Sequence, residues 1–235
     1  MNNISIIIFA NNEEKLIYDA VFEIIETIDK FDFLYEIIII NDGSKDKTIN
    51  EIKKLELNYP KIIKILDNLT KEGIAKSVKK GLEIASFEKV LWLPGDGAYE
   101  PISLKNIMIN NENYDLIIGY RNNKSERKFK RFFLSYILSV ILNMIFFENI
   151  KDYNGTIIFN KKDFELIYFP EHPSFQWVIL IQLLKLKKKY IQKPVNMKIP
   201  EPGNTSTSIN FKTFFSYFFS LINLIRRVFF NNNDK

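Results

Sequence analysis

A single aspartate, Asp96, lies in a short turn of the kind that holds ligands in α/β proteins. The apolar run 90–93 predicts a buried strand, and Pro94 and Gly95 end it at once. A carboxylate on a tight turn at the carboxyl end of such a strand is well placed to hold a ligand or a divalent metal. The alternative is that Asp96 only caps the helix that Pro101 begins, and this stretch alone leaves both open.

Two further polar turns follow predicted strands. Residues 10–13 (Ala-Asn-Asn-Glu) follow one apolar run, and residues 41–44 (Asn-Asp-Gly-Ser) follow four consecutive isoleucines. The carboxyl ends of parallel strands meet at one edge of a sheet, where α/β proteins bind their ligands. We therefore expect Asp42 and Asp96 to converge on one pocket.

A basic cluster lies between positions 121 and 131, where six Arg and Lys residues are accompanied by one acidic residue, Glu126. It predicts a phosphate site or contact with an anionic membrane, with a solvated loop as the alternative. Sixteen uncharged residues follow at 132–147, fewer than a membrane-spanning helix needs. A basic segment before an apolar helix is typical of an element in the membrane interface, and a buried core helix is the alternative. Residues 211–230 form a second segment of this kind.

The composition restricts the chemistry. The 235 residues, 46% of them hydrophobic, can bury a full core. There is no cysteine and only one histidine, His172, which excludes disulfides and thiolate metal sites and disfavours a histidine triad or metal centre. Any metal must therefore have oxygen ligands. No motif supports nucleic-acid binding. The first residues do not resemble a secretion signal, so we expect a cytoplasmic protein, peripheral at the inner face of the membrane.

The hydrophobic pattern predicts the scaffold that positions the three turns. Apolar runs at 4–9, 36–40, 62–66 and 90–93 alternate with three segments of helical spacing. This order predicts an α/β protein with a doubly wound, mostly parallel sheet and right-handed crossovers. Neither G-x-G-x-x-G nor a P-loop occurs, so a dinucleotide-binding fold has no support.

Five segments resemble, in this order, the family 2 glycosyltransferases of the GT-A fold, and among them the polyprenyl-phosphate sugar transferases similar to dolichol-phosphate mannose synthase. They read S-I-I-I-F-A-N-N-E-E, E-I-I-I-I-N-D-G-S-K-D-K-T, G-I-A-K-S-V-K-K-G-L-E-I-A, L-P-G-D-G-A-Y-E-P and D-Y-N-G-T-I-I-F-N. The resemblance implies a GT-A domain over residues 1–200, including an interface helix at about 129–147. Residues 201–235 would add a linker, a C-terminal amphipathic helix at the membrane interface and a polar tail.

The resemblance also implies a donor site for a nucleotide-diphosphate sugar. The nucleotide would be bound by Ala10, Glu13, Asp42 and Gly73. Asp96 would be catalytic by holding a divalent cation, Mg²⁺ or Mn²⁺, on the diphosphate, where the cation stabilises the charge of the leaving group.

The chain departs from the family at three positions of this donor site. Asn11 stands where the family has an aromatic residue, Asn41 replaces the first of two aspartates, and Pro94 replaces the first acid of a D-x-D motif. Mg²⁺ commonly uses one or two protein carboxylates, so Asp96 alone is compatible with a cation on the diphosphate. The departures leave a weaker metal site or an inactive relative as alternatives.

For the acceptor, the resemblance implies that Arg121, Arg131 and Ser135 bind the phosphate of a polyprenyl phosphate. Guanidinium groups suit this task because they grip phosphate oxygens with paired hydrogen bonds. A phosphate monoester is already ionised near neutral pH and needs no base, whereas a hydroxyl acceptor does. Asp152 is the acidic residue in a family-like position that could act as a base or orient the acceptor, and capping the turn before Gly155 is the alternative.

Together these features predict an inverting, metal-dependent transferase that moves a hexose from a nucleotide-diphosphate sugar to a polyprenyl phosphate at the cytoplasmic membrane face. One alternative is a transferase acting on a hydroxyl of a surface polysaccharide or glycolipid. The other is a catalytically inactive, membrane-associated partner that binds nucleotide sugar.

Overall fold

The computed structural model describes residues 3–31, 33–109, 111–122, 129–172, 174–198 and 211–230, without the side chains of 129–132 and 211–216. Residues 123–128 of the basic cluster lie outside this description, as do residues 201–210 and 231–235 of the segment predicted to contain the linker and the polar tail.

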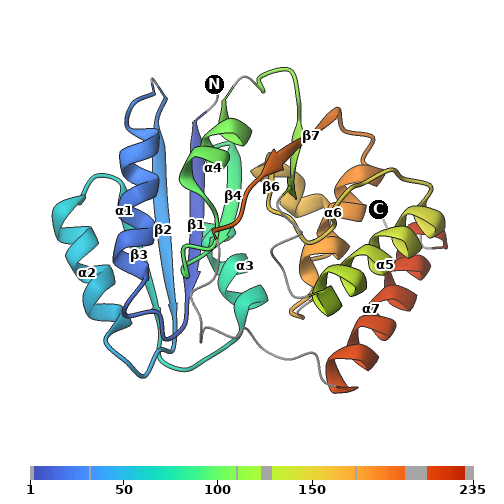
Figure 1. Ribbon diagram of the computed structural model, residues 1–235, viewed down its shortest axis with the longest axis horizontal. Coiled ribbons are helices and arrows are strands. Elements are labelled where there is room, and N and C mark those ends of the chain that lie inside the picture. The colour runs from blue at the N-terminus through green and yellow to red at the C-terminus, as the bar shows by residue number, and fades with distance from the viewer. Residues whose placement is uncertain are drawn as a thin grey trace.

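One mixed sheet of seven strands forms the centre of the molecule, in the order β3-β2-β1-β4-β6-β5-β7 (Figure 1). The strands are β1 (Ile4–Ala10), β2 (Tyr35–Asp42), β3 (Ile63–Asn68), β4 (Lys89–Pro94), β5 (Leu116–Arg121), β6 (Ile157–Asn160) and β7 (Tyr190–Val195). All neighbouring pairs are parallel except those of β6, which runs antiparallel to β4 and to β5. The first four predicted strands and their parallel pairing are confirmed.

Helices cover both faces of the sheet. They are α1 (Ile17–Ile28), α2 (Thr48–Asn58), α3 (Ile74–Ile84), α4 (Pro101–Met108), α5 (Phe129–Phe146), the 3₁₀ helix η2 (Lys161–Leu166), α6 (Phe175–Lys185) and α7 (Phe211–Phe229). Ile6 belongs to the core cluster that contains residues of α1, α2 and α4, whereas its neighbour Ile7 belongs to the cluster on the opposite face, with residues of α3, α5 and α6. Because both faces are covered, β2 is apolar on both sides, which explains its run of four isoleucines.

Helices α5 and α7 lie side by side at the end of the molecule away from α2 (Figure 1), with the rings of Phe146 and Phe229 stacked at 5.7 Å. Leu142 on α5 is buried in the core, so the alternative of a core helix, considered for 132–147, is correct for one side of α5. Leu224 shows that one side of α7 is buried in the core as well. The other sides expose apolar residues, including Met144 at 63% and Phe219 at 61%. No helix in the described part of the chain is long and apolar enough to cross a bilayer.

Candidate active site

The carboxyl ends of β1, β2, β4 and β5 lie along one edge of the sheet. Ala10 ends β1 beside Asn41 of β2, and Phe9 lies beside Pro94 of β4. Neighbouring strands are about 4.8 Å apart, so the ends of β2 and β4 are separated by roughly 10 Å. The turn that carries Asp96 is tied to β1, because the backbone N–H of Gly95 donates to the carbonyl of Phe9 at 2.8 Å. The structure therefore brings Ala10 and the turns of Asp42 and Asp96 to the same edge.

Asp42 is buried and holds the loop 69–73 against the end of β2. Its Oδ1 accepts hydrogen bonds from the backbone N–H of Glu72 at 2.8 Å and from the Asn68 amide at 3.2 Å. Its Oδ2 accepts one from the backbone N–H of Gly73 at 2.9 Å. The structure thus brings Asp42 and Gly73 into direct contact. Among the described residues Oδ2 has this one donor, which leaves an acceptor position for an N–H group of a base.

Gly43 is what lets the loop approach this closely. Its φ is +61°, and a Cβ atom there would lie 2.4 Å from the backbone nitrogen of Lys71. A residue with a side chain would be strained at this φ and would displace the loop. The N-D-G-S motif therefore combines the acid that binds the loop with the glycine that admits it.

Asn11 joins the β1 turn to this loop. Its Nδ2 donates to the carbonyl of Asp42 at 2.7 Å, and its Oδ1 accepts from Nζ of Lys71 at 2.7 Å. At the position where the family has an aromatic residue, this chain has a polar link between two turns. Lys71 did not emerge from the sequence as a site residue, because a lone lysine in a polar loop carries no local signal.

Glu13 and Asp96 form an acidic pair at the ends of β1 and β4. Burial, and then the negative charges of Asp96 and Asp46, raise the pKa of Glu13 from 4.5 to about 7. Partial removal from water raises the pKa of Asp96 as well, although the residue is exposed and Ala98 N–H donates to its Oδ1 at 3.0 Å. Each carboxylate is thus destabilised where it lies, and a bound cation would relieve both.

The carboxylates of Glu13 and Asp96 offer the oxygen ligands that Mg²⁺ and Mn²⁺ prefer. The described residues contain no cluster of three or more acidic or histidine side chains that could enclose a metal ion. Mg²⁺ commonly uses one or two protein carboxylates and completes its shell with phosphate oxygens and water. The donor set of Asp96 with Glu13 nearby therefore suits a cation shared with a diphosphate better than an ion enclosed by protein.

On the acceptor side, Arg121 at the end of β5 forms a buried, two-pronged ion pair with Asp152. Nε of Arg121 lies 2.6 Å from Oδ2 of Asp152 and Nη2 lies 2.7 Å from Oδ1. Ser135 on α5 is the third predicted residue here, with its Oγ 3.4 Å from Nη2. Burial alone would lower the pKa of Arg121, but the hydrogen bond and charge of Asp152 outweigh it and raise that pKa. Arg131 lies in α5, and its side chain is outside the described residues.

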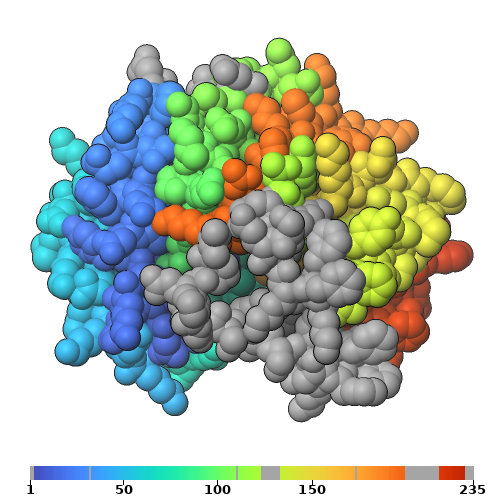
Figure 2. Space-filling model, in the orientation of Figure 1, coloured from blue at the N-terminus to red at the C-terminus, as the bar shows by residue number. Residues whose placement is uncertain are grey.

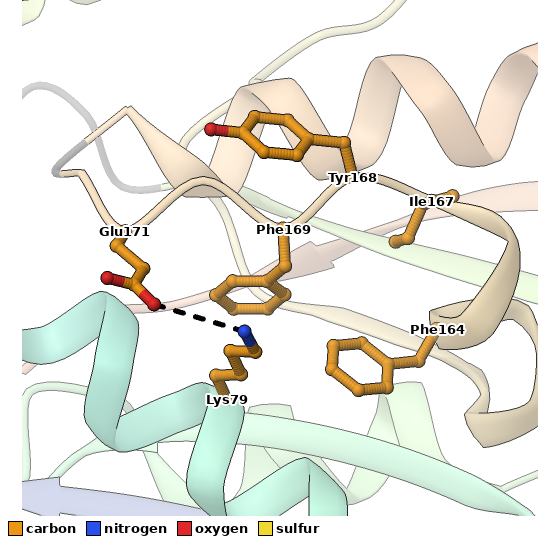
Figure 3. Close-up of a pocket in the computed structure, with 6 residues that line it drawn as sticks. All are labelled: Lys79, Phe164, Ile167, Tyr168, Phe169 and Glu171. Carbon is orange, nitrogen blue, oxygen red and sulfur yellow. Dashed lines mark ion pairs between the residues drawn. The ribbon is translucent and has the colours of Figure 1, made fainter.

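A cavity of about 370 Å³ opens elsewhere, between α3 and the segment that begins with η2 (Figure 3). It is lined by Lys79, Phe164, Ile167, Tyr168, Phe169 and Glu171. None of the predicted site residues lines it. Nζ of Lys79 and a carboxylate oxygen of Glu171 are 3.9 Å apart, and both side chains are largely exposed, so this pair contributes little to stability. We therefore place the candidate active site at the strand ends and not in this cavity.

Comparison with known proteins identifies the family. A family model described as Glycosyl transferase family 2 matches residues 5–168. The chain belongs to glycosyl transferase family 2. The matched segment contains the three polar turns, Arg121 and Asp152, so both parts of the candidate site lie within the family domain.

Curated relatives within family 2 include enzymes named for a lipid phosphate. The chain is 28% identical over 213 residues to the dolichyl-phosphate beta-glucosyltransferase ALG5A of Trichomonas vaginalis, covering 84% of this chain and 64% of that protein. It is also 28% identical over 228 residues to the dolichyl-phosphate beta-glucosyltransferase of Dictyostelium discoideum, covering 88% and 67%. The chain thus spans about two thirds of the length of these relatives.

The fold is also found in solved structures. The glucosyl-3-phosphoglycerate synthase of Mycobacterium tuberculosis, crystallised with Mg²⁺ and uridine diphosphate, superposes with a TM-score of 0.67 at 13% identity, covering 95% of this chain and 79% of that one. At this identity the likeness establishes the fold. The expected GT-A-like α/β architecture with a mostly parallel sheet is therefore correct for this family 2 protein.

Proposed function

We propose that this protein is an inverting hexosyltransferase that moves a sugar from a nucleotide-diphosphate donor to a polyprenyl phosphate at the cytoplasmic face of a membrane. The observation that carries the proposal is that Asp96, assigned to the donor diphosphate, and Arg121, assigned to the acceptor phosphate, lie on one sheet edge. Asp96 follows β4 and Arg121 ends β5, with the single strand β6 between them. Two strand spacings amount to roughly 10 Å, which leaves room for one sugar ring between a leaving diphosphate and an acceptor phosphate.

The donor half uses residues that already contact one another. Asp42 would accept an N–H group of the base at Oδ2, while Gly73 and Glu72 hold the carboxylate in place. Ala10 and Glu13 lie next to this point at the end of β1 and would line the base and ribose pocket. A divalent cation held by Asp96, with Glu13 nearby, would neutralise the charge that develops on the nucleoside diphosphate as the bond to the sugar breaks.

In the acceptor half, an oxygen of the lipid phosphate would attack the anomeric carbon as the diphosphate leaves with the bonding electrons. Attack from the face opposite the leaving group inverts the configuration at that carbon. The attacking oxygen carries no proton near neutral pH, so no protein base is required. Arg121 and Ser135 would hold the remaining phosphate oxygens. The names of the curated relatives, which are dolichyl-phosphate glucosyltransferases, support this class of acceptor.

Helices α5 and α7 would dock the protein on the membrane that contains this acceptor. Figure 2 shows them reaching the surface together at one end of the molecule. These helices, and the residue after each of them, expose large apolar side chains: Phe133, Leu134, Tyr136, Met144, Phe147, Phe218, Phe219, Phe229 and Phe230. Patches of this kind mark interaction sites, and the adjacent basic cluster would favour anionic lipid.

The proposal is tested by measuring sugar transfer to a short-chain polyprenyl phosphate with a panel of nucleotide sugars, in Mg²⁺ or Mn²⁺ and in chelator. We expect transfer that chelator abolishes and that Asp96→Ala lowers by about 100-fold or more, a typical loss when charge stabilisation at the reacting centre is removed. Asp19→Ala, at an exposed position on α1, is the matched control and should retain activity. Full activity of Asp96→Ala would show that the cation assignment is wrong.

The replacement of an acid by Pro94 favours one alternative, a catalytically inactive protein that binds nucleotide sugar. The same panel separates the two functions. An inactive partner would be stabilised against thermal unfolding by one nucleotide sugar but would transfer none of it, because a ligand that binds only the folded state raises the melting temperature without any chemistry.

A further inference from the structure

Asp152 is fully buried and its carboxylate is saturated with hydrogen bonds. Oδ1 accepts from Nη2 of Arg121 at 2.7 Å and from the backbone N–H of Asn154 at 3.1 Å. Oδ2 accepts from Nε of Arg121 at 2.6 Å and from its backbone N–H at 3.3 Å. A carboxylate offers about four acceptor positions, and these four donors from the described residues already occupy them. No position remains from which Asp152 could accept a proton from an acceptor hydroxyl.

The same contacts determine how Arg121 is presented. Two nitrogens of the planar guanidinium are fixed by one carboxylate, so the plane of the group cannot rotate. Among the described residues none accepts a hydrogen bond from Nη1, and Oγ of Ser135 lies 3.4 Å from Nη2. The edge of Arg121 away from Asp152 therefore has unused N–H donors beside a hydroxyl, an arrangement that suits oxygens of a phosphate.

The charges of the Arg121–Asp152 pair also argue against a role of Asp152 as a base. Removing one partner of a buried ion pair is strongly destabilising, because it leaves an unpaired buried charge. A base must take up a proton during the reaction, which would remove the negative charge that strengthens both hydrogen bonds to Arg121 at the moment when the acceptor has to be held. The arrangement favours a carboxylate that stays charged throughout the reaction.

We infer that Asp152 is a positioning residue, which orients Arg121 for an anionic acceptor, and is not a base for a hydroxyl acceptor. The inference rests on the proposed function, because it assigns the unused donors of Arg121 to the phosphate of a polyprenyl phosphate. It also decides between the two roles that the sequence left open for Asp152, and the Asn154 contact shows that the turn-capping role is compatible with it.

The test compares the steady-state kinetics of Asp152→Asn with those of Asp163→Asn. Asp163 is the matched control, because it is equally buried and forms an ion pair with Lys188 at 2.8 Å outside the candidate site. In Asp152→Asn an amide N–H would face the guanidinium, and Arg121 would turn away. We expect KM for the polyprenyl phosphate to rise by about 10- to 100-fold, as displacements near 1 Å can produce, with a smaller change in kcat and little change in Asp163→Asn.

A base would behave differently. Loss of a base lowers kcat while KM for the acceptor stays near its original value, and this result with a lipid phosphate would overturn the inference. A double-mutant cycle gives a second measurement. If Asp152 acts through Arg121, adding Asp152→Asn to Arg121→Gln should have almost no further effect, and additive losses would contradict a shared role.

Asp152→Glu serves if Asp152→Asn does not fold, because it keeps the negative charge and leaves Arg121 paired. It should also raise KM for the acceptor, since one extra methylene shifts the guanidinium, and an unchanged KM would count against positioning. Failure of the proposed function gives a distinct result. The unaltered protein would then transfer no sugar to polyprenyl phosphate with any donor, and calorimetry would show no binding of a short-chain polyprenyl phosphate. These results would also refute the inference about Asp152.

Discussion

Replacing Glu13 with glutamine should stabilise the protein at neutral and alkaline pH and leave its stability in acid almost unchanged. Burial and the charges of Asp96 and Asp46 raise the pKa of Glu13 from 4.5 to about 7. Between these values the folded protein keeps a proton that the unfolded chain has released. Stability therefore falls as the pH rises through this window, and the penalty is complete above about 7.

The size of the effect follows from the same values. A rise from 4.5 to about 7 sets a ceiling of about 3 kcal/mol, at roughly 1.4 kcal/mol for each tenfold change in proton affinity. Glu13 is only partly buried, and water screens part of its repulsion, so we expect about 1–2 kcal/mol. Glutamine has the shape of the protonated acid without a charge. It should raise the melting temperature by roughly 2–8 °C at pH 8, since 1 kcal/mol corresponds to about 2–4 °C in a protein of this size.

The assay is thermal or urea unfolding at pH 5 and pH 8, with chelator present so that no cation contributes. Glu56→Gln, on the exposed face of α2, removes the same charge away from the site and serves as the control. Stabilisation by Glu13→Gln that is equal at the two pH values, or larger at pH 5, would refute the account of an acidic pair. A stabilisation at pH 8 that Glu56→Gln reproduces would assign the effect to net charge.

Two further predictions concern the loop over the donor site and the membrane. Asp42→Ala should cost about 2–4 kcal/mol in urea unfolding, because two backbone N–H groups of the loop 69–73 lose their acceptor, and a cost below 0.5 kcal/mol would contradict this contact. The double variant Met144→Glu/Phe219→Glu should reduce sedimentation with phosphatidylglycerol vesicles at least about tenfold without lowering the melting temperature, because both side chains are mostly exposed. Leu57→Glu on α2, at a position 80% exposed, should leave vesicle binding unchanged. Equal binding by all three proteins would exclude docking through α5 and α7.

Local patterns in the sequence were sufficient for the first half of the fold. Runs of isoleucine, helical spacing and polar turns predicted the first four strands and the edge at which Asp42 and Asp96 lie. These features depend on the conformational preferences of neighbouring residues, which the sequence displays directly. The second half of the fold was harder to predict from local sequence patterns. The short strand β6 lies between β4 and β5 and is antiparallel to both. No turn near β6 in the sequence indicates this pairing.

The sequence by itself therefore determined the family motifs, the order of the early strands and the acidic and basic residues available to a site. Only the tertiary structure decided how those residues are used. It paired Arg121 with Asp152 across 31 positions, folded the loop 69–73 onto Asp42, and raised the pKa of Glu13 by burying it and placing Asp96 near it. The physical reason is that charge pairing and desolvation depend on distances between segments far apart in the chain. Those distances exist only once the strands have taken their register and the helices have excluded water.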